Sequence, residues 1–316
     1  MKQRLLAILF LSVSCFFAAA GTSLSPPSSA VRGEPGFFIL SHDYKNENIG
    51  GFSLHIEYSD KSLAPVYYAV EMTQKPYGGG FIAGSHTAAK GMNKASVFLA
   101  AFPVRAPLGL AKAVVLASDG SKIAECSFEV KNRIFSKENL YLNSQLTSLR
   151  IDPDPIKTEQ AKRYQELLGR VDPMADYLDS AFVSPLDSNR ITTEFGLTRH
   201  YLYSNGKTDV SDHNGIDYGS PAGTLVYAAG RGRVVMAENR IVTGKTVILE
   251  HLPGTYTIYM HLADIYAEAG KILKRGAVLG TVGMTGLATG PHLHWELRIN
   301  GQAVDPEAML GKWPVF

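Results

Sequence analysis

The segment Thr289-Gly-Pro-His-Leu-His-Trp-Glu296 determines how the rest of this sequence is interpreted, because it places two imidazoles two residues apart. If this segment is a strand with Leu293 and Trp295 facing the protein core, His292 and His294 share the opposite face, about 6.6 Å apart along the backbone. The glycine and proline that precede them favour a turn, which would fix where the strand begins. We therefore expect a strand with one apolar face and one face that carries paired histidines.

Two upstream segments carry further side chains of the kinds that bind metal ions or transfer protons. They are His213-Asn-Gly-Ile-Asp217 and the shorter Tyr-Met-His261-Leu. Catalytic zinc takes three protein ligands, commonly histidines and a carboxylate, and keeps one position for water. His213 and Asp217 are four residues apart, and this even spacing aims both side chains the same way on an extended segment. The third nitrogen can come from His292 or His294, and the spacing does not decide between them.

The remaining histidines suit acid–base chemistry beside such a metal. Bound zinc lowers the pKa of its water towards about 7. A neighbouring imidazole can then accept the proton and later pass one to a leaving amine. The candidates for this work are His261 and whichever of His292 and His294 does not bind the metal.

Length and composition set the broad class of the protein. The chain has 316 residues, 45% of them hydrophobic, which is enough for a sizeable core and for two domains. Its 30 glycines and 15 tyrosines favour turn-rich β structure. The formal net charge is +2, and without Lys2 and Arg4 the chain carries 29 basic and 29 acidic residues. Because there is also no run of basic residues, the charge pattern does not favour nucleic-acid binding.

Residues 1–20 have the composition of a cleaved export signal. Lys2 and Arg4 precede an apolar run that continues to Phe17, and Ala18-Ala-Ala20 offers small residues for cleavage. An uncleaved membrane anchor is the alternative, but the run is short for a complete span. We expect an exported protein of the periplasm or cell envelope that is not an integral membrane protein after signal cleavage.

The next part of the chain is predicted as a tether and an accessory domain. Residues 21–35 are rich in Ser, Pro and Gly and predict a flexible tether. Residues 36–131 hold at least five short segments in which apolar and polar residues alternate, and Asp119-Gly120 is a tight hairpin signal. This pattern favours a small antiparallel β-sandwich. Cys126 alternates with polar neighbours, so we expect it to pack in the core rather than act as a nucleophile or ligand.

A linker and a second β domain follow. Residues 132–189 predict a linker with a Pro-rich joint and a helix near residues 158–168. Residues 190–310 are again rich in short apolar segments bounded by Gly, Pro or Asn, and they predict a compact domain in which the histidines converge in a groove. The whole chain is thus predicted as all-β apart from a short helical linker. We also expect a fragment that starts near Val183 to fold by itself.

Five motifs together resemble the signatures of lysostaphin-type (LytM-like) zinc metallopeptidases. They are Arg190-Ile-Thr-Thr-Glu-Phe-Gly196, His213-Asn-Gly-Ile-Asp217-Tyr-Gly219, Tyr259-Met-His261-Leu262, Thr285-Gly-Leu-Ala-Thr-Gly-Pro-His292-Leu-His294-Trp-Glu296 and Val304-Asp-Pro306. Each fragment is common by itself, whereas all of them in this order are specific. The resemblance covers about residues 190–310.

The resemblance implies a fold, a cofactor and a reaction. Members of this family cut peptide bonds in bacterial cell-wall peptidoglycan, often next to glycine or within stem-peptide cross-links. The implied fold is a two-sheet β core of the duplicated hybrid motif type with an open groove. By this resemblance, one zinc ion per chain is held by His213, Asp217 and His294, and the catalytic pair is His261 and His292. The implied partners are peptidoglycan peptides, and no protein partner is indicated.

Two residues outside this set, one tyrosine and one histidine, also have expected roles. Some relatives use a tyrosine near the first metal ligand to help stabilise an oxyanion, and Tyr203 is the candidate here. His251 closes a predicted strand, and we expect it to make a structural hydrogen bond.

Two alternative functions belong to different classes. Some family members have lost ligands and act as inactive adaptors that activate other wall hydrolases, but all five positions are present here. Glycine-bounded β repeats also occur in biotinyl-type and phosphotransfer domains. The chain lacks a Met-Lys-Met lysine hairpin, and export would separate it from cytosolic phosphoryl donors. The complete set of five residues therefore favours a zinc endopeptidase.

Overall fold

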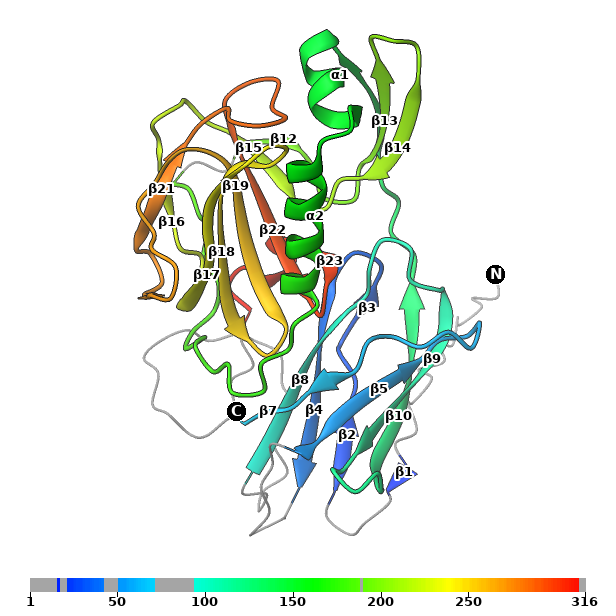
Figure 1. Cartoon of the computed structure of the whole chain (residues 1–316). Helices are drawn as coiled ribbons and strands as arrows, with labels where there is room; N and C mark the ends of the chain where they lie inside the picture. Colours follow the sequence, from blue (N-terminus) through cyan, green and yellow to red (C-terminus); the bar gives the residue numbers. More distant parts are fainter. Residues whose placement is uncertain (1–15, 18–21, 43–50, 72–93, 188–189, 313–316) are drawn as a thin grey trace, which may run out of the picture.

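The computed structural model describes residues 16–17, 22–42, 51–71, 94–187 and 190–312, and strands dominate it. The described strands form four sheets, two in the N-terminal part of the chain and two in the C-terminal part. The described residues also contain two α-helices, which lie beside the C-terminal sheets (Figure 1). The prediction of an all-β fold with a helical linker is confirmed.

The two N-terminal sheets form a sandwich. Phe38 on one sheet meets Phe128 on the other with ring centroids 5.2 Å apart, and Cys126 is buried. The first sheet has the order β1-β10-β9-β5-β6, with β3 beside β10. Its strands are β1 (Phe16–Phe17), β3 (Ala30–Val31), β5 (Ser53–Glu57), β6 (Tyr67–Tyr68), β9 (Gly109–Leu116) and β10 (Lys122–Lys131). The second sheet consists, in order, of β2 (Ser23–Ser25), β4 (Pro35–His42), β8 (Lys94–Ala101) and β7 (Val70–Glu71).

Residues 22–35 belong to this sandwich, in contrast to the flexible tether that we expected. Thr22, Leu24 and Ala30 are buried, β2 pairs with β4, and β3 runs parallel to β10. A few buried apolar side chains and the ladder hydrogen bonds outweigh the Ser- and Pro-rich composition of the segment. The predicted export signal lies outside the described residues except for Phe16–Phe17, so it stays a prediction.

The segment after the sandwich adds both a strand and a helix to the C-terminal part. β11 (Lys137–Leu142) pairs parallel with β13 (Thr198–Tyr203), which pairs antiparallel with β14 (Thr208–Asp212). α1 (Ser144–Ile151), which we did not predict, follows β11 and packs against this three-stranded sheet. We call β11, α1, β13 and β14 the arm, and Figure 1 shows it at the top of the molecule.

The predicted linker helix is present as α2 (Pro155–Leu168), which begins slightly earlier than expected. Asp154 caps it, because its carboxylate accepts hydrogen bonds from the backbone N–H groups of Ile156 and Lys157. Neither helix in the described part of the chain is long and apolar enough to span a membrane.

The C-terminal part is built on a ten-stranded sheet with the order β12-β15-β22-β19-β18-β17-β20. In addition, β23 pairs with β22, and β21 pairs with both β16 and β19. The strands are β12 (Ile191–Thr193), β15 (Ile216–Gly219), β16 (Leu225–Tyr227), β17 (Gly232–Arg240), β18 (Gly244–Leu252), β19 (Thr255–Ile265), β20 (Ile272–Leu273), β21 (Val278–Val282), β22 (His292–Ile299) and β23 (Gln302–Val304). The 3-10 helix η2 (Pro306–Met309) follows.

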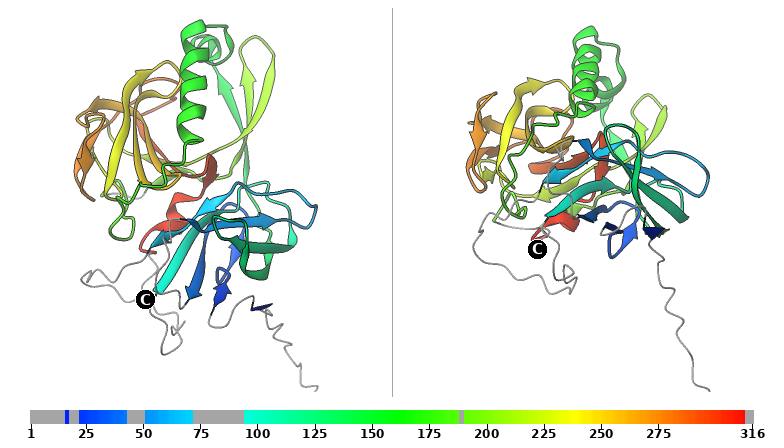
Figure 2. Two further views of the ribbon diagram at one scale, coloured as in Figure 1. Left: turned by 60° about the horizontal axis from the view of Figure 1, so that its bottom comes forward. Right: turned by 90° about the horizontal axis from the view of Figure 1, so that it is seen from below.

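The two faces of this sheet are covered differently. On β22, Leu293, Trp295 and Leu297 are buried in the main core, as their alternation predicts. Part of the other face is covered by α2, which lies along it in Figures 1 and 2. Tyr164 and Leu168 of α2 share a hydrophobic cluster with side chains of β17, β18 and β19, namely Met236, Ile248, Tyr256, Ile258 and Met260. The remainder of this face carries the predicted site residues.

The sandwich is joined to the C-terminal part by hydrogen bonds, an ion pair and a shared core. The backbone N–H of Asp305 donates to the carbonyl oxygen of Gly33 at 2.6 Å. The Asp305 carboxylate also pairs with Arg133 at 2.7 Å, and the side chain of Asn300 donates to the carbonyl oxygen of Val66 at 2.7 Å. Buried residues of both parts belong to one hydrophobic cluster. The accessory domain is therefore packed onto the site domain.

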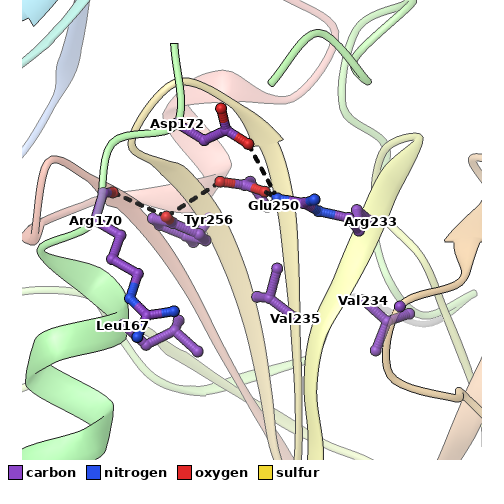
Figure 3. Close-up of a pocket in the computed structure, with 9 residues that line it drawn as sticks. Leu167, Arg170, Asp172, Arg233, Val234, Val235, Glu250 and Tyr256 are labelled. Atoms are coloured by element: carbon purple, nitrogen blue, oxygen red, sulfur yellow. Dashed lines mark hydrogen bonds and ion pairs between the residues drawn. The ribbon is translucent and has the colours of Figure 1, made fainter. Parts of the chain in front are cut away.

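A polar network braces the C-terminal end of α2 against the sheet, around the pocket shown in Figure 3. Glu250 is 2% exposed and accepts hydrogen bonds from Arg233 at 2.6 Å and from the Tyr256 hydroxyl at 3.3 Å. Arg233 also donates to Asp172 at 3.2 Å, and the Tyr256 hydroxyl lies 2.9 Å from the carbonyl oxygen of Arg170. Because the buried carboxylate is paired in this way, we interpret the network as a structural brace.

Candidate metal centre

All five predicted site residues line one groove between the large sheet and the arm. His213 joins β14 to β15, Asp217 lies on β15, His261 lies on β19, and His292 and His294 lie on β22. The arm contributes further lining side chains, which include Glu138, Arg150, Arg199 and Tyr201. The structure thus brings together residues that are up to 81 positions apart in the chain.

Three of the five form a compact buried cluster. His213 Nε2 lies 3.1 Å from Asp217 Oδ1 and 3.0 Å from His294 Nδ1, and His294 Nδ1 lies 2.7 Å from Asp217 Oδ1. All three residues are less than 9% exposed. Antiparallel pairing of β15 with β22 places Asp217 directly opposite His294. Among the described residues, this is the group whose ligand atoms are arranged to hold one metal ion.

Hydrogen bonds on the far side of each imidazole decide which nitrogen faces the cluster. His213 Nδ1 donates to the carbonyl oxygen of Glu194 at 2.9 Å, which leaves the lone pair on Nε2. His294 Nε2 lies 3.0 Å from Glu296 Oε1 and donates to it, so Nδ1 is free to be a ligand. Two nitrogen lone pairs and a carboxylate oxygen therefore converge on one point, and a cation satisfies all three together. Two imidazoles and one carboxylate are ligands that zinc accepts, so the residues fit a single zinc ion.

Protons and a metal cation compete for the side chains of this cluster. Burial would raise the pKa of Asp217, but hydrogen bonds from His213 and His294 hold it well below its ordinary value. Burial would lower the pKa of His294, but hydrogen bonds to the Asp217 and Glu296 carboxylates raise it to about 9. A metal ion must displace that proton from His294 to bind. The second carboxylate oxygen of Asp217 lies 3.6 Å from Arg199, which leaves Oδ1 for the metal.

The other two histidines lie beside this cluster. The rings of His261 and His292 have centroids 4.8 Å apart, and His292 Nε2 lies 3.7 Å from Asp217 Oδ1. His261 Nδ1 donates to the carbonyl oxygen of Thr285, and His292 Nδ1 donates to that of Gly290, each at 2.8 Å. Each ring therefore keeps a lone pair on Nε2. Burial lowers the pKa of His261 to about 3 and also lowers the pKa of His292, so both rings are neutral proton acceptors.

A β-bulge sets the direction of His261. The pairing of β18 with β19 shifts by one residue between Lys245 and Val247, and His261 has φ of +62°. The left-handed region is costly for a residue with a Cβ, and such strain is concentrated at functional sites. The extra residue lets Met260 pack under α2 while His261 reaches the groove. No pattern in the sequence predicts this bulge.

Gly215, in the segment between His213 and Asp217, is required by a close approach of two strands. A Cβ at this position would lie 2.4 Å from the carbonyl oxygen of Trp295 and 2.9 Å from His294 Nε2. Any side chain here would therefore push β15 away from β22. This explains in physical terms why a glycine stands between two of the three residues of the cluster.

Several residues around the site were not predicted. Glu296 and Arg298 continue the His292–His294 face of β22, and the alternation of the strand could have revealed them. Tyr164 on α2 and Arg199 on the arm reach the site from separate elements, and no local pattern marks them.

Two of the other expectations have clear outcomes. The Tyr203 hydroxyl accepts a hydrogen bond from Arg150 at 2.9 Å and its ring is buried, so Tyr203 is not placed to act on a substrate in the groove. Tyr201, on the same strand, lines the groove instead. The structural role expected for His251 is confirmed, because its nitrogens bond to the Arg231 carbonyl oxygen and the Thr257 hydroxyl.

Comparisons with known proteins find relatives of the C-terminal part of the chain. Residues 211–306 match the profile described as Peptidase family M23. The chain is 39% identical over 124 residues to the DD-carboxypeptidase/endopeptidase Mpg of Neisseria meningitidis, a match that covers 39% of this chain and 28% of that protein. It is also 39% identical over 136 residues to the peptidoglycan DD-endopeptidase ShyA of Vibrio cholerae, covering 42% of this chain and 31% of that protein. The chain thus spans less than a third of the length of either relative.

A solved structure extends the likeness in fold beyond the matched segment. A peptidase M23 from Pseudomonas aeruginosa aligns with a TM-score of 0.60 at 21% identity, covering 91% of this chain and 97% of that one. At this identity the likeness concerns the fold alone, and it includes the sandwich. The sequence match and the buried His-Asp-His cluster both lie within residues 211–306. The chain therefore carries a domain of peptidase family M23, the family of the lysostaphin-type metallopeptidases.

Proposed function

We propose that this protein is an exported zinc endopeptidase that hydrolyses peptide cross-links or stem peptides of bacterial peptidoglycan. The observation that carries the proposal is the convergence of His213, Asp217 and His294 on one point, next to two neutral histidines in an open groove. Such a set combines a metal site with a proton acceptor, which is what metal-assisted hydrolysis requires.

The proposed roles follow from which nitrogen each ring presents. His213 Nε2, Asp217 Oδ1 and His294 Nδ1 hold zinc, which when bound polarises a carbonyl group and lowers the pKa of water. His261 and His292 each present an unprotonated Nε2 towards the groove. One of them accepts the proton of the attacking water and later delivers a proton to the leaving amine. Burial lowers the pKa values of both rings, so both are neutral before the reaction.

The substrate class is proposed from the relatives and from the shape of the site. Two relatives are named for peptidoglycan or for DD-peptide cleavage. The groove runs between the large sheet and the arm and is open to solvent, as a polymeric substrate requires. The leader predicted in residues 1–20 would deliver the protein to the periplasm or cell envelope, where this substrate lies. The inactive-adaptor alternative is not favoured, because all five residues are present and line one groove.

The test is a digestion of purified peptidoglycan by the protein without residues 1–20, followed by mass spectrometry of the released peptides. We expect new peptide fragments with zinc, none after treatment with a chelator, and recovery when zinc is added back. A His213→Ala variant serves as the matched control. Release of the same fragments in the presence of chelator would refute the metal-dependent reaction.

A further inference from the structure

The side chains behind His294 form a buried chain of contacts that leads away from the groove. Glu296 is 4% exposed, and its Oε1 accepts the His294 Nε2 hydrogen at 3.0 Å. Its Oε2 accepts a hydrogen bond from Arg298 Nε at 2.6 Å. The hydroxyl of Tyr164 donates to the same Oε2 at 3.3 Å. The carboxylate that sets the orientation of His294 is thus itself fixed from two sides.

Tyr164 stands out because it comes from α2, outside residues 211–306 that match the peptidase family. Tyr164 is 8% exposed and belongs to the hydrophobic cluster under the helix. The guanidinium of Arg240 lies over the ring, 4.6 Å from its centroid, and also donates to the carbonyl oxygen of Gln160 on α2. The position of the Tyr164 hydroxyl is therefore determined by how α2 packs on the sheet.

We propose that α2 contributes to the metal centre through Tyr164. Tyr164 on α2 and Glu296 on β22 are positioning residues for His294. Glu296 holds the His294 ring so that Nδ1 faces His213 and Asp217, and Arg298 and Tyr164 hold Glu296. Outer partners of this kind typically contribute 10- to 100-fold to metal affinity. The inference rests on the proposed function in one respect, namely that His294 is a metal ligand.

The structure supplies a matched control for this proposal. Tyr256 belongs to the same hydrophobic cluster as Tyr164, and its hydroxyl likewise lies 3.3 Å from a buried carboxylate oxygen, that of Glu250 (Figure 3). Glu250, however, accepts hydrogen bonds from Arg233, and none of its hydrogen bonds within the described residues involves a site histidine. Tyr256→Phe thus removes a comparable hydroxyl from the brace without touching the chain of contacts to His294.

The experiment compares zinc affinity in the full chain and in its Tyr164→Phe, Glu296→Gln and Tyr256→Phe variants, by competition with a chromogenic chelator. We expect the dissociation constant to rise about 10- to 100-fold in Glu296→Gln and about three- to tenfold in Tyr164→Phe. Tyr256→Phe should stay within about twofold of the parent. The visible absorption spectrum of the cobalt(II)-loaded protein should change in the first two variants and not in the third, because it reports ligand orientation.

Each outcome distinguishes the proposals. Parental zinc affinity and cobalt spectra in both Tyr164→Phe and Glu296→Gln would overturn the positioning role of α2. An equal loss in Tyr164→Phe and Tyr256→Phe would also overturn it, since general loosening of the helix would then be the cause. Should thermal unfolding show that Glu296→Gln is not folded, Tyr164→Phe decides alone. Failure of the parent chain to bind zinc contradicts the proposed function itself.

Discussion

The rings of His261 and His292 lie with their centroids 4.8 Å apart, one on the bulge of β19 and the other at the first residue of β22. Neither ring belongs to the three-residue cluster, yet both lie beside it, and each keeps a lone pair on Nε2 because its Nδ1 donates to a backbone carbonyl oxygen. This arrangement separates the five residues into two groups with different expected behaviour.

Loss of either neighbouring histidine should impair the reaction and spare the metal. His261→Ala and His292→Ala should each lower the rate of peptide hydrolysis by about 100-fold or more, the usual scale for general acid–base groups. Both variants should retain about one zinc per chain by elemental analysis. A variant that loses its zinc would show that the histidine is a ligand.

Loss of a cluster residue should empty the site. His213→Ala, Asp217→Ala and His294→Ala should each reduce zinc content and activity together, because two remaining ligands do not make a catalytic zinc site. Full zinc occupancy in the double variant His213→Ala/Asp217→Ala would contradict the assignment.

The Gly215 position should tolerate no side chain. In Gly215→Ala the new Cβ would collide with the carbonyl oxygen of Trp295, and we expect a loss of about 1–3 kcal/mol in the free energy of unfolding together with weaker zinc binding. Gly290→Ala is the control, since a Cβ there meets nothing within 4 Å. Urea unfolding and zinc titration of both variants measure the difference, and equal behaviour would contradict the close approach.

His251 should make stability depend on pH. Burial lowers its pKa from 6.5 to about 4 in the folded protein, so the unfolded chain binds a proton that the folded one does not. Its stabilising contribution is complete above pH 6.5, falls as the pH drops towards 4, and amounts to about 3 kcal/mol in all. Urea unfolding of metal-free protein should show this slope, and a His251→Gln variant should lack that part of it. Parallel curves for the two proteins would refute the prediction.

A stable fragment of the site domain should start earlier in the chain than Val183, the boundary expected from the sequence. A fragment that starts near Val183 lacks β11, the partner of β13, and lacks α2, which covers the apolar side chains of β19. We now expect it to be markedly less stable than a fragment that starts near residue 132, and the thermal midpoints of the two compare them directly. Equal midpoints would show that β11, α1 and α2 contribute no stability.

The sequence predicts the parts of this fold that depend on local alternation. The order Leu293, Trp295 and Leu297 against His292 and His294 fixes which face of β22 is buried, and the structure agrees. The same alternation identifies the sandwich strands. The division of the five site residues into ligands and proton acceptors came from a family resemblance, because spacing treats His292 and His294 alike.

Other features depend on contacts between distant segments and escape such patterns. The parallel pairing of β11 with β13 joins segments about 60 residues apart. The bulge at His261 depends on register with β18, and the burial of Leu24 depends on a sheet that closes over it. Tyr164 reaches Glu296 across 132 residues of sequence. In each case the energy comes from a partner that the local sequence does not contain.

The bond between Asp305 and Gly33 has a consequence for when the molecule can fold. It joins the first strands of the sandwich to a residue that follows almost all the rest of the chain, and the two regions share one core. Pairings of such long sequence separation form late and slowly. During synthesis, this seam between the sandwich and the C-terminal part can close only after residues around 305 have been made.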